Sequence, residues 1–146
     1  LDVLLAVVGA DVTSVEAVGV NVLTPRVDIA NARLRFASGC IANVTASRIS
    51  RERVRKARFF QHDSYVSIDY AEQEVEAYQL VSEGGGRPAI RGGPIEITRD
   101  EPLRLELVDF VDAIRMNRPS AVTGDDGRVA LALATQVSEL ISKGAA

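Results

Sequence analysis

The feature that most constrains this fold is the stretch 27–50, VDIANARLRFASGCIANVTASRIS, in which two β-rich runs meet at Ser38-Gly39. Ser-Gly between such runs indicates a hairpin with a two-residue turn, because glycine adopts the positive φ that a tight turn requires. The turn fixes the register of the two strands. Counting outward from it predicts three cross-strand pairs on one face: Phe36 with Ile41, Leu34 with Asn43, and Ala32 with Thr45. The opposite face then holds three further pairs: Arg35 with Ala42, Arg33 with Val44, and Ile29 with Arg48.

Neither face of this predicted hairpin is wholly apolar. We therefore expect a sheet that carries helices on one side and meets water or a partner on the other. Alternating side chains predict further strands over 12–23, 57–61, 65–70 and 74–81. Pro25 ends the first of these, and His62-Asp63 is expected to form a turn. Four or more antiparallel strands in sequence are typical of a meander.

Two glycine clusters, Gly84-Gly85-Gly86 and Gly92-Gly93-Pro94, flank 88–90. Their spacing matches neither G-x-G-x-x-G nor G-x-x-x-x-G-K-[ST], and no helical pattern begins beside them. We expect both clusters to be flexible turns and not phosphate-binding loops.

Residues 1–8 predict a short amphipathic helix, because apolar side chains recur at i, i+3, i+4 and i+7 and Gly9 suits a C-cap. The apolar positions are Leu1, Leu4, Leu5 and Val8. Nothing precedes Leu1 to satisfy the first N–H groups of this helix. We expect the helix to be cut in its first turn and the chain to be a fragment of a longer protein.

A longer helix is predicted to begin at Pro102, which suits a first turn, and to stop at Asn117-Arg118-Pro119. Its apolar stripe comprises Leu103, Leu107, Phe110, Val111 and Ile114.

The last helix is predicted to run from Thr123 toward Gly144. Thr123 is followed three positions later by Asp126, a carboxylate variant of the capping box. Asp125 and Asp126 then lie in a first turn, where they stabilise the helix dipole, and we do not expect them to bind a metal.

Composition narrows the function classes. The chain has 146 residues, so we expect a single domain over 1–146. Apolar residues make up 47% and the net charge is −3, so neither a membrane nor nucleic acid is expected as a partner.

One cysteine, Cys40, and one histidine, His62, cannot form an internal disulfide or a Cys/His zinc site, which favours a reducing, cytoplasmic setting. We expect Cys40 to be a small packed side chain and His62 to be a turn residue.

The strongest charged feature is the connection 48–58, which contains only one acidic residue, Glu52. Its basic residues are Arg48, Arg51, Arg53, Arg55, Lys56 and Arg58. Such a connection binds RNA or a phosphorylated ligand in some proteins, and in others it is solvated or paired with acids elsewhere. The residues alone leave these alternatives open.

Three sequence segments resemble one family, and together they extend across essentially the whole chain. In chain order they are LDVLLAVVG, NARLRFASGCIANVTAS and EPLRLELVDFVDAIRMNRPSAVTGDDGRVALALA. The resemblance is to the C-terminal domain of glucose-fructose oxidoreductase / inositol 2-dehydrogenase (Gfo/Idh/MocA) family oxidoreductases. It implies an α+β fold: an open, mostly antiparallel sheet with helices packed on one face, as in the domains of dihydrodipicolinate-reductase-like and glucose-fructose-oxidoreductase type.

In that family an N-terminal Rossmann domain binds NAD or NADP, and the second domain supplies one wall of the sugar pocket and the oligomer interface. A lysine from an E-K-P motif and a histidine just before the short helix act on the substrate hydroxyl. The resemblance places both groups outside this chain. It therefore implies no catalytic, cofactor-binding or metal-binding residue within 1–146, and no hydride transfer by this chain alone.

The resemblance also directs attention to the connection after the central hairpin, from which family members draw substrate contacts. Arg48, Arg51 and Arg53 are our candidates for substrate binding. Guanidinium groups bind phosphates and carboxylates through two parallel hydrogen bonds, and a nucleotide-linked sugar presents such groups. The resemblance is greatest to members that act on nucleotide-activated amino sugars.

Two hypotheses follow. In the first, the chain is the substrate-binding and oligomerisation domain of an NAD(P)-dependent sugar oxidoreductase, and forms a dimer or tetramer through its sheet. The sheet face expected to hold Leu34, Phe36 and Ile41 is then covered by the two long helices or by a second subunit. In the second, the chain is a free-standing α+β module that binds an acidic partner through the basic 48–58 connection. The sequence encoded upstream of Leu1 distinguishes them.

Overall fold

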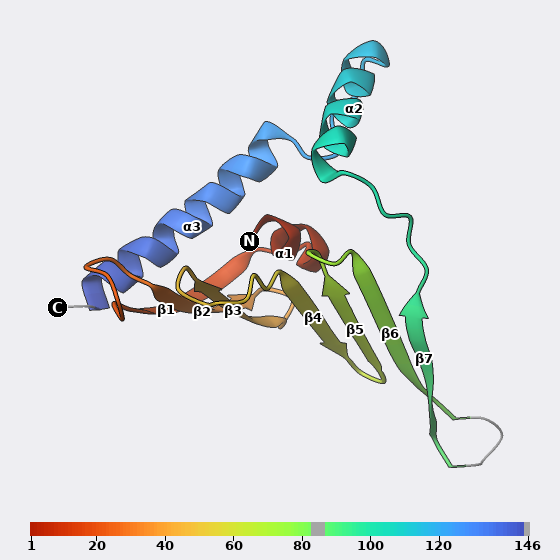
Figure 1. Cartoon of the computed structure of the whole chain (residues 1–146), viewed down its shortest axis with the longest axis horizontal. Coiled ribbons are helices and arrows are strands. Elements are labelled where there is room, and N and C mark those ends of the chain that lie inside the picture. The colour runs from red at the N-terminus through yellow and green to blue at the C-terminus, as the bar shows by residue number, and fades with distance from the viewer. Residues whose placement is uncertain (83–86, 145–146) are drawn as a thin grey trace. The chain divides into compact units, whose positions relative to one another are not determined.

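The computed structural model describes residues 1–82 and 87–144, so the predicted turn at Gly84-Gly85-Gly86 lies outside the described residues (Figure 1). The elements in chain order are α1 (Asp2–Val8), β1 (Val12–Val20), β2 (Ile29–Phe36), β3 (Ile41–Ser47), β4 (Lys56–Gln61), β5 (Ser64–Asp69), β6 (Glu74–Val81), β7 (Ala89–Ile95), α2 (Pro102–Arg115) and α3 (Gly124–Gly144). The strands form two antiparallel sheets, which together with the helices confirm the predicted α+β class.

The chain divides into two compact units. The first unit comprises 1–50 and 109–146, and the second comprises 51–108. The single domain over 1–146 stays a prediction.

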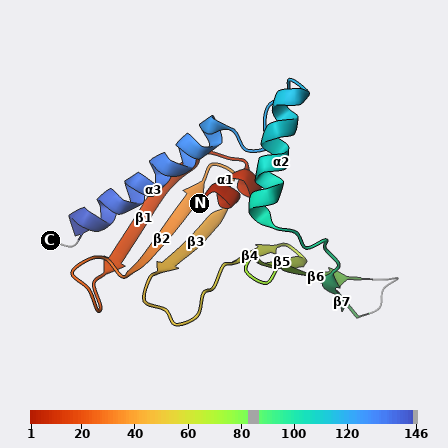
Figure 2. The ribbon, with the colours of Figure 1, turned by 45° about the horizontal axis from the view of Figure 1, so that its top comes forward.

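The first unit is a three-stranded sheet in the order β1-β2-β3 with helices on one face (Figure 2). Leu34 on the central strand is fully buried, and Leu133 of α3 packs in the same cluster. Four apolar side chains at the chain start also pack there: Leu1, Leu4, Leu5 and Val8. The predicted first helix is confirmed, and Gly9 ends it in the left-handed conformation with φ of +59°.

The hairpin between β2 and β3 has a three-residue loop and not the predicted two-residue turn. The Phe36 carbonyl accepts from the Gly39 N–H at 2.9 Å, and the Phe36 N–H donates to the Cys40 carbonyl at 3.0 Å. Gly39 has φ of +85°, as expected for the left-handed residue that closes a three-residue hairpin loop. The extra loop residue shifts the pairing, and the predicted register is wrong by one residue.

The observed register sorts the side chains into two distinct faces. The β2–β3 pairs are Ile29 with Ser47, Ala30 with Ala46, Asn31 with Thr45, Ala32 with Val44, Arg33 with Asn43, Leu34 with Ala42, and Arg35 with Ile41. Near the hairpin the helix-covered face is therefore apolar, which contradicts the expectation that neither face would be. Leu34 and Phe36 contact the helices of their own unit, whereas Ile41 lies on the opposite face beside Arg35.

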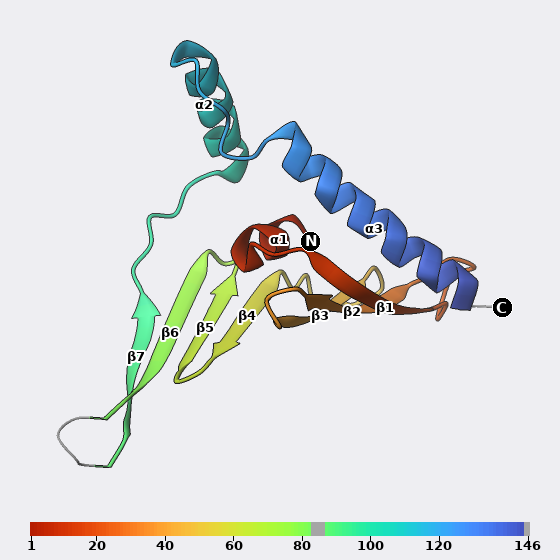
Figure 3. The same ribbon diagram turned by 180° about the vertical axis from the view of Figure 1, so that it is seen from behind.

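The second unit is a sheet in the order β4-β5-β6-β7, whose strands lie side by side in Figure 3. The predicted turn at His62-Asp63 joins β4 to β5, and Asp63 has φ of +60°.

The prediction for Gly92-Gly93-Pro94 is wrong, because these residues belong to β7 and pair with β6. A Cβ on Gly92 would lie 2.0 Å from the Ala77 carbonyl oxygen, so the glycine permits the close approach of the two strands.

Both predicted long helices are confirmed as α2 and α3. After α2 the chain turns at Asn117, which has φ of +49°. At the start of α3 the Thr123 N–H donates to the Asp126 carboxylate at 2.8 Å, and the Asp126 N–H donates to the Thr123 hydroxyl at 3.3 Å. This reciprocal pair is the predicted capping box. No helix among the described residues is long and apolar enough to cross a membrane.

Candidate functional site

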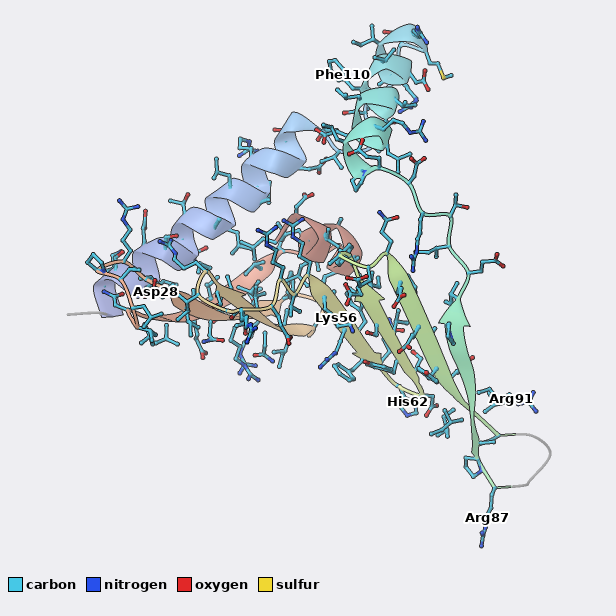
Figure 4. All side chains as sticks on the ribbon, in the orientation of Figure 1. Asp28, Lys56, His62, Arg87, Arg91 and Phe110 are labelled. Atoms are coloured by element: carbon cyan, nitrogen blue, oxygen red, sulfur yellow. The ribbon has the colours of Figure 1, made fainter. Side chains whose placement is uncertain are left out.

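Asp28 is the most constrained polar residue of the first unit, and it lies at the end of the β1–β2 loop (Figure 4). It is 2% exposed, and one carboxylate oxygen, Oδ2, accepts from the backbone N–H groups of Val22, Leu23 and Thr24 at 2.8 to 2.9 Å. The other oxygen, Oδ1, accepts from the Thr24 hydroxyl at 2.7 Å. The predicted strand 12–23 stops at Val20 because these loop N–H groups bind a side chain and not a neighbouring strand.

The electrostatics of Asp28 follow from these contacts. Burial alone disfavours the charged form and raises the pKa of the carboxyl, but the hydrogen bonds from Leu23, Thr24 and Val22 favour the charged form. The hydrogen bonds outweigh the burial, so the pKa of Asp28 is held well below its usual range. Asp28 is therefore a structural anion that orders its loop.

The backbone of Asp28 connects this loop to the residue that follows β3. Its N–H donates to the Val20 carbonyl at 2.9 Å, and its carbonyl accepts from the Arg48 N–H at 3.0 Å. The Ser47 hydroxyl oxygen then accepts from the backbone N–H of Ser50 at 3.1 Å, which forms a tight turn. The backbone that carries Arg48 is thus fixed at both ends.

The structure places the three predicted substrate-binding residues, Arg48, Arg51 and Arg53, in the connection between β3 and β4. Arg48 belongs to the first unit and the other two belong to the second. All three are exposed, and no hydrogen bond or ion pair in the described part of the chain engages their side chains. Just after this connection, Lys56 at the start of β4 pairs with Asp69 at 3.5 Å. The guanidinium groups of Arg48, Arg51 and Arg53 are therefore available to an anion.

The uncovered face of the β1–β3 sheet holds a shallow hollow of about 390 Å³. Its polar lining consists of Glu16, Asn31, Arg33, Asn43 and Thr45. The Thr45 hydroxyl donates to the Asn31 side-chain oxygen at 2.8 Å. The predicted register had set Asn43 and Thr45 on the core face, so sequence analysis missed this polar group. A correct count of the hairpin loop would have found it.

Asp28 was missed for a different reason. It lies between Val27 and Ile29, in a segment that sequence analysis treated only as a strand. A single acidic residue among apolar neighbours, just after a loop with free N–H groups, is the signal that would have identified it.

The structure shows the surroundings of the single cysteine, Cys40, and the single histidine, His62. Cys40 is exposed, so the prediction of a packed side chain is wrong, although its carbonyl closes the hairpin loop. The exposed imidazole of His62 contacts the Asp63 carboxylate at 2.7 Å in the turn. Among the described residues there is no group of His, Cys, Asp and Glu that could hold a metal ion.

Known proteins resemble this chain in sequence and in fold. It is 36% identical over 138 residues to a UDP-N-acetylglucosamine 3-dehydrogenase from Acidithiobacillus ferrooxidans, which covers 94% of this chain and 44% of that protein. The solved structure of UDP-N-acetylglucosamine 3-dehydrogenase GnnA from the same organism matches with a TM-score of 0.85 and 34% identity, covering 96% of this chain and 44% of that chain.

A more distant solved structure shares the fold. An aldose-aldose oxidoreductase from Caulobacter crescentus, complexed with glycerol, matches with a TM-score of 0.76 and 23% identity over 98% of this chain and 43% of that chain. No family model matches the chain.

These likenesses confirm the resemblance that the sequence suggested. In sequence and in fold the chain resembles the C-terminal part of Gfo/Idh/MocA-type oxidoreductases. It spans less than half the length of the relatives that it matches.

Proposed function

We propose that this chain is the substrate-binding part of a longer nicotinamide-dependent dehydrogenase that oxidises a hydroxyl of a nucleotide-linked amino sugar. The observation that carries the proposal is the 36% identity, across 94% of the chain, to a relative that bears the name UDP-N-acetylglucosamine 3-dehydrogenase. The reaction removes a hydride from the carbinol carbon and a proton from its hydroxyl. In the proposal, the groups that accept them belong to the rest of the longer protein.

The described residues do not fit a nicotinamide dinucleotide. Dinucleotides bind where parallel strands and helices alternate and a glycine-rich turn opens a helix. Both sheets of this chain are antiparallel, and Gly92 and Gly93 lie within β7. We therefore assign NAD or NADP to an N-terminal Rossmann domain outside these residues, and derive no step of hydride transfer from this chain.

The role we assign to this chain is recognition of the anionic part of the substrate. Arg48, Arg51 and Arg53 are exposed and have no acidic partner among the described residues. Guanidinium groups bind phosphate oxygens through paired, charge-assisted hydrogen bonds, and a nucleoside diphosphate sugar presents two phosphates. Asp28 supports this role, because its carbonyl fixes the backbone N–H of Arg48 at 3.0 Å.

The proposal includes a cytoplasmic homo-oligomer, a dimer or a tetramer. It is tested with the full-length protein and NAD or NADP by following nicotinamide reduction with UDP-N-acetylglucosamine, free N-acetylglucosamine and glucose. We expect turnover with the nucleotide-linked sugar and a much lower kcat/KM for the two neutral sugars. Equal turnover of all three would contradict the anionic substrate. No turnover together with binding of an acidic protein to 48–58 would favour the alternative of an interaction module.

A further inference from the structure

Two connecting segments of the first unit meet at one end of its sheet (Figure 2). The loop 21–28 joins β1 to β2, and the turn 48–50 follows β3. Because the Asp28 carbonyl accepts from the Arg48 N–H at 3.0 Å, the two segments are hydrogen-bonded to each other. Each segment carries one arginine, Arg26 in the loop and Arg48 in the turn. The two arginines therefore lie on adjoining stretches of backbone within one unit.

Thr24 connects Arg26 to the hydrogen bonds around Asp28. The Thr24 hydroxyl donates to Oδ1 of Asp28 at 2.7 Å and accepts from the Arg26 N–H at 3.2 Å. A series of hydrogen bonds thus runs from the backbone of Arg26 through Thr24 and Asp28 to the backbone of Arg48. Residues whose backbone is already ordered lose less conformational freedom when they bind a ligand. The network therefore prepares both arginines for a shared ligand.

Close packing against α3 supports the same loop. A Cβ on Gly19 would overlap a methyl group of Ile141 and would lie 2.7 Å from a methyl group of Val27. Glycine at this position lets β1, α3 and the loop approach one another closely. Ile141 is buried there. The loop that carries Arg26 is therefore held by packing as well as by hydrogen bonds.

The exposed charges of these two segments are both positive. Arg26 and Arg48 are exposed, and within residues 1–82 and 87–144 no hydrogen bond or ion pair engages either side chain. The acid of the loop, Asp28, is buried, and its two carboxylate oxygens already accept four hydrogen bonds from 22–24. Its charge is therefore engaged inside the loop, and both guanidinium groups are available to an external anion.

We propose that Arg26 is a further substrate-binding residue, and that Arg26 and Arg48 together bind the diphosphate of a nucleotide-linked sugar. The ligand is taken from the proposed function, on which this assignment rests. A diphosphate consists of two phosphoryl groups joined by one oxygen, so each guanidinium group binds one of them through charge-assisted hydrogen bonds. Sequence analysis missed Arg26 because it stands alone between Pro25 and Val27, outside the basic 48–58 connection.

Calorimetric titration of the full-length protein with UDP, UMP and NADH tests the assignment. Arg26→Ala and Arg48→Ala should each raise the Kd of UDP roughly tenfold, the loss of one charge-assisted hydrogen-bonding group. UMP has a single phosphate, so only one of the two changes should weaken its binding. NADH also contains a diphosphate, but we assign it to another domain, and its Kd should not change. Arg128→Ala on α3 is the matched control, since Arg128 is exposed and outside this network, and it should alter no Kd.

Thr24 variants test the link between the two arginines. Thr24→Val removes the hydroxyl but keeps both guanidinium groups, and it should raise the Kd of UDP severalfold because the backbone of Arg26 loses its hydrogen bond. Thr24→Ser retains the hydroxyl and should bind UDP like the unaltered protein. Equal affinities in the two variants would contradict the positioning role of Thr24.

Unchanged UDP binding in Arg26→Ala would overturn the assignment of Arg26 and leave the proposed function standing. Absence of UDP binding by the unaltered protein would instead contradict the proposed function. The shared diphosphate would be wrong if both alanine variants weakened UMP as much as UDP, or if Arg26→Ala weakened NADH as much as UDP. Thermal melts show which variants fold. If Arg26→Ala fails to fold, Arg26→Gln carries the same prediction, because it also removes the charge.

Discussion

The two units of this chain use the same antiparallel strands but differ in what their sheets bury. In the first unit Leu34 is fully buried, and α1 and α3 supply the side chains that cover it. In the second unit the most buried sheet residue described is a polar one, Ser67, and Phe60 is 77% exposed. A sheet needs a covered apolar face to be stable. The first unit therefore carries a core of its own, whereas most described side chains of the second unit's sheet are exposed or half-buried.

Replacing a core residue gives the largest expected effect and is the simplest way to break this comparison. Leu34→Ala should lower the free energy of unfolding by about 2–5 kcal/mol, because it leaves a cavity in a closed core. Phe60→Ala in the second unit removes a larger side chain but should cost only about 0.5 kcal/mol, since that side chain is exposed. Urea denaturation measures both. Equal losses would contradict the difference between the units.

The elements of the first unit could be predicted from sequence because their signals are local. The capping box at Thr123 and Asp126 and the apolar periodicity of 1–8 each act within one or two helical turns. The register of the hairpin could not be predicted from sequence, because Ser38-Gly39 is compatible with both a two-residue and a three-residue loop. One residue of difference moves every β3 side chain to the other face.

The second unit was harder to predict, because its decisive contacts join distant residues. Gly92 looks like a turn residue in sequence, and only the close approach of β6 at Ala77 explains it as part of a strand.

The candidate substrate-binding site was predicted in part. The arginines of 48–58 stand out by charge alone, whereas the anchoring of Arg48 by Asp28 depends on a contact between two separate loops.

A glycine substitution gives the next largest effect and sharpens the comparison within the second unit. Gly92→Ala should cost about 2–3 kcal/mol, because the backbone has φ of +131° and the new Cβ would meet the Ala77 carbonyl. Gly127→Ala in α3 is the control: nothing lies within 4 Å of its Cβ, and alanine should stabilise the helix by about 0.5–1 kcal/mol. Thermal denaturation distinguishes them. A neutral Gly92→Ala would show that the β6–β7 pairing contributes little.

A pH series tests the Asp28 loop in the first unit. The pKa of Asp28 is lowered in the folded protein, so its contribution to stability is present above its unfolded pKa and is lost as the pH falls toward the folded value. Asp28→Asn should therefore lower the Tm most at neutral pH, and the difference from wild type should shrink in acid. Asp2→Asn serves as the control, because Asp2 is exposed. A Tm difference that is constant with pH would contradict a charged Asp28.

Steady-state kinetics of the full-length enzyme test the central claim most directly, since they ask whether the 48–58 connection binds the anionic part of the substrate. Arg48→Ala and Arg53→Ala should each raise the KM for UDP-N-acetylglucosamine about tenfold, the loss of one charge-assisted hydrogen bond. The KM for free N-acetylglucosamine should hardly change, and Arg128→Ala on α3 should alter neither. Equal increases for the charged and the neutral sugar would contradict the account.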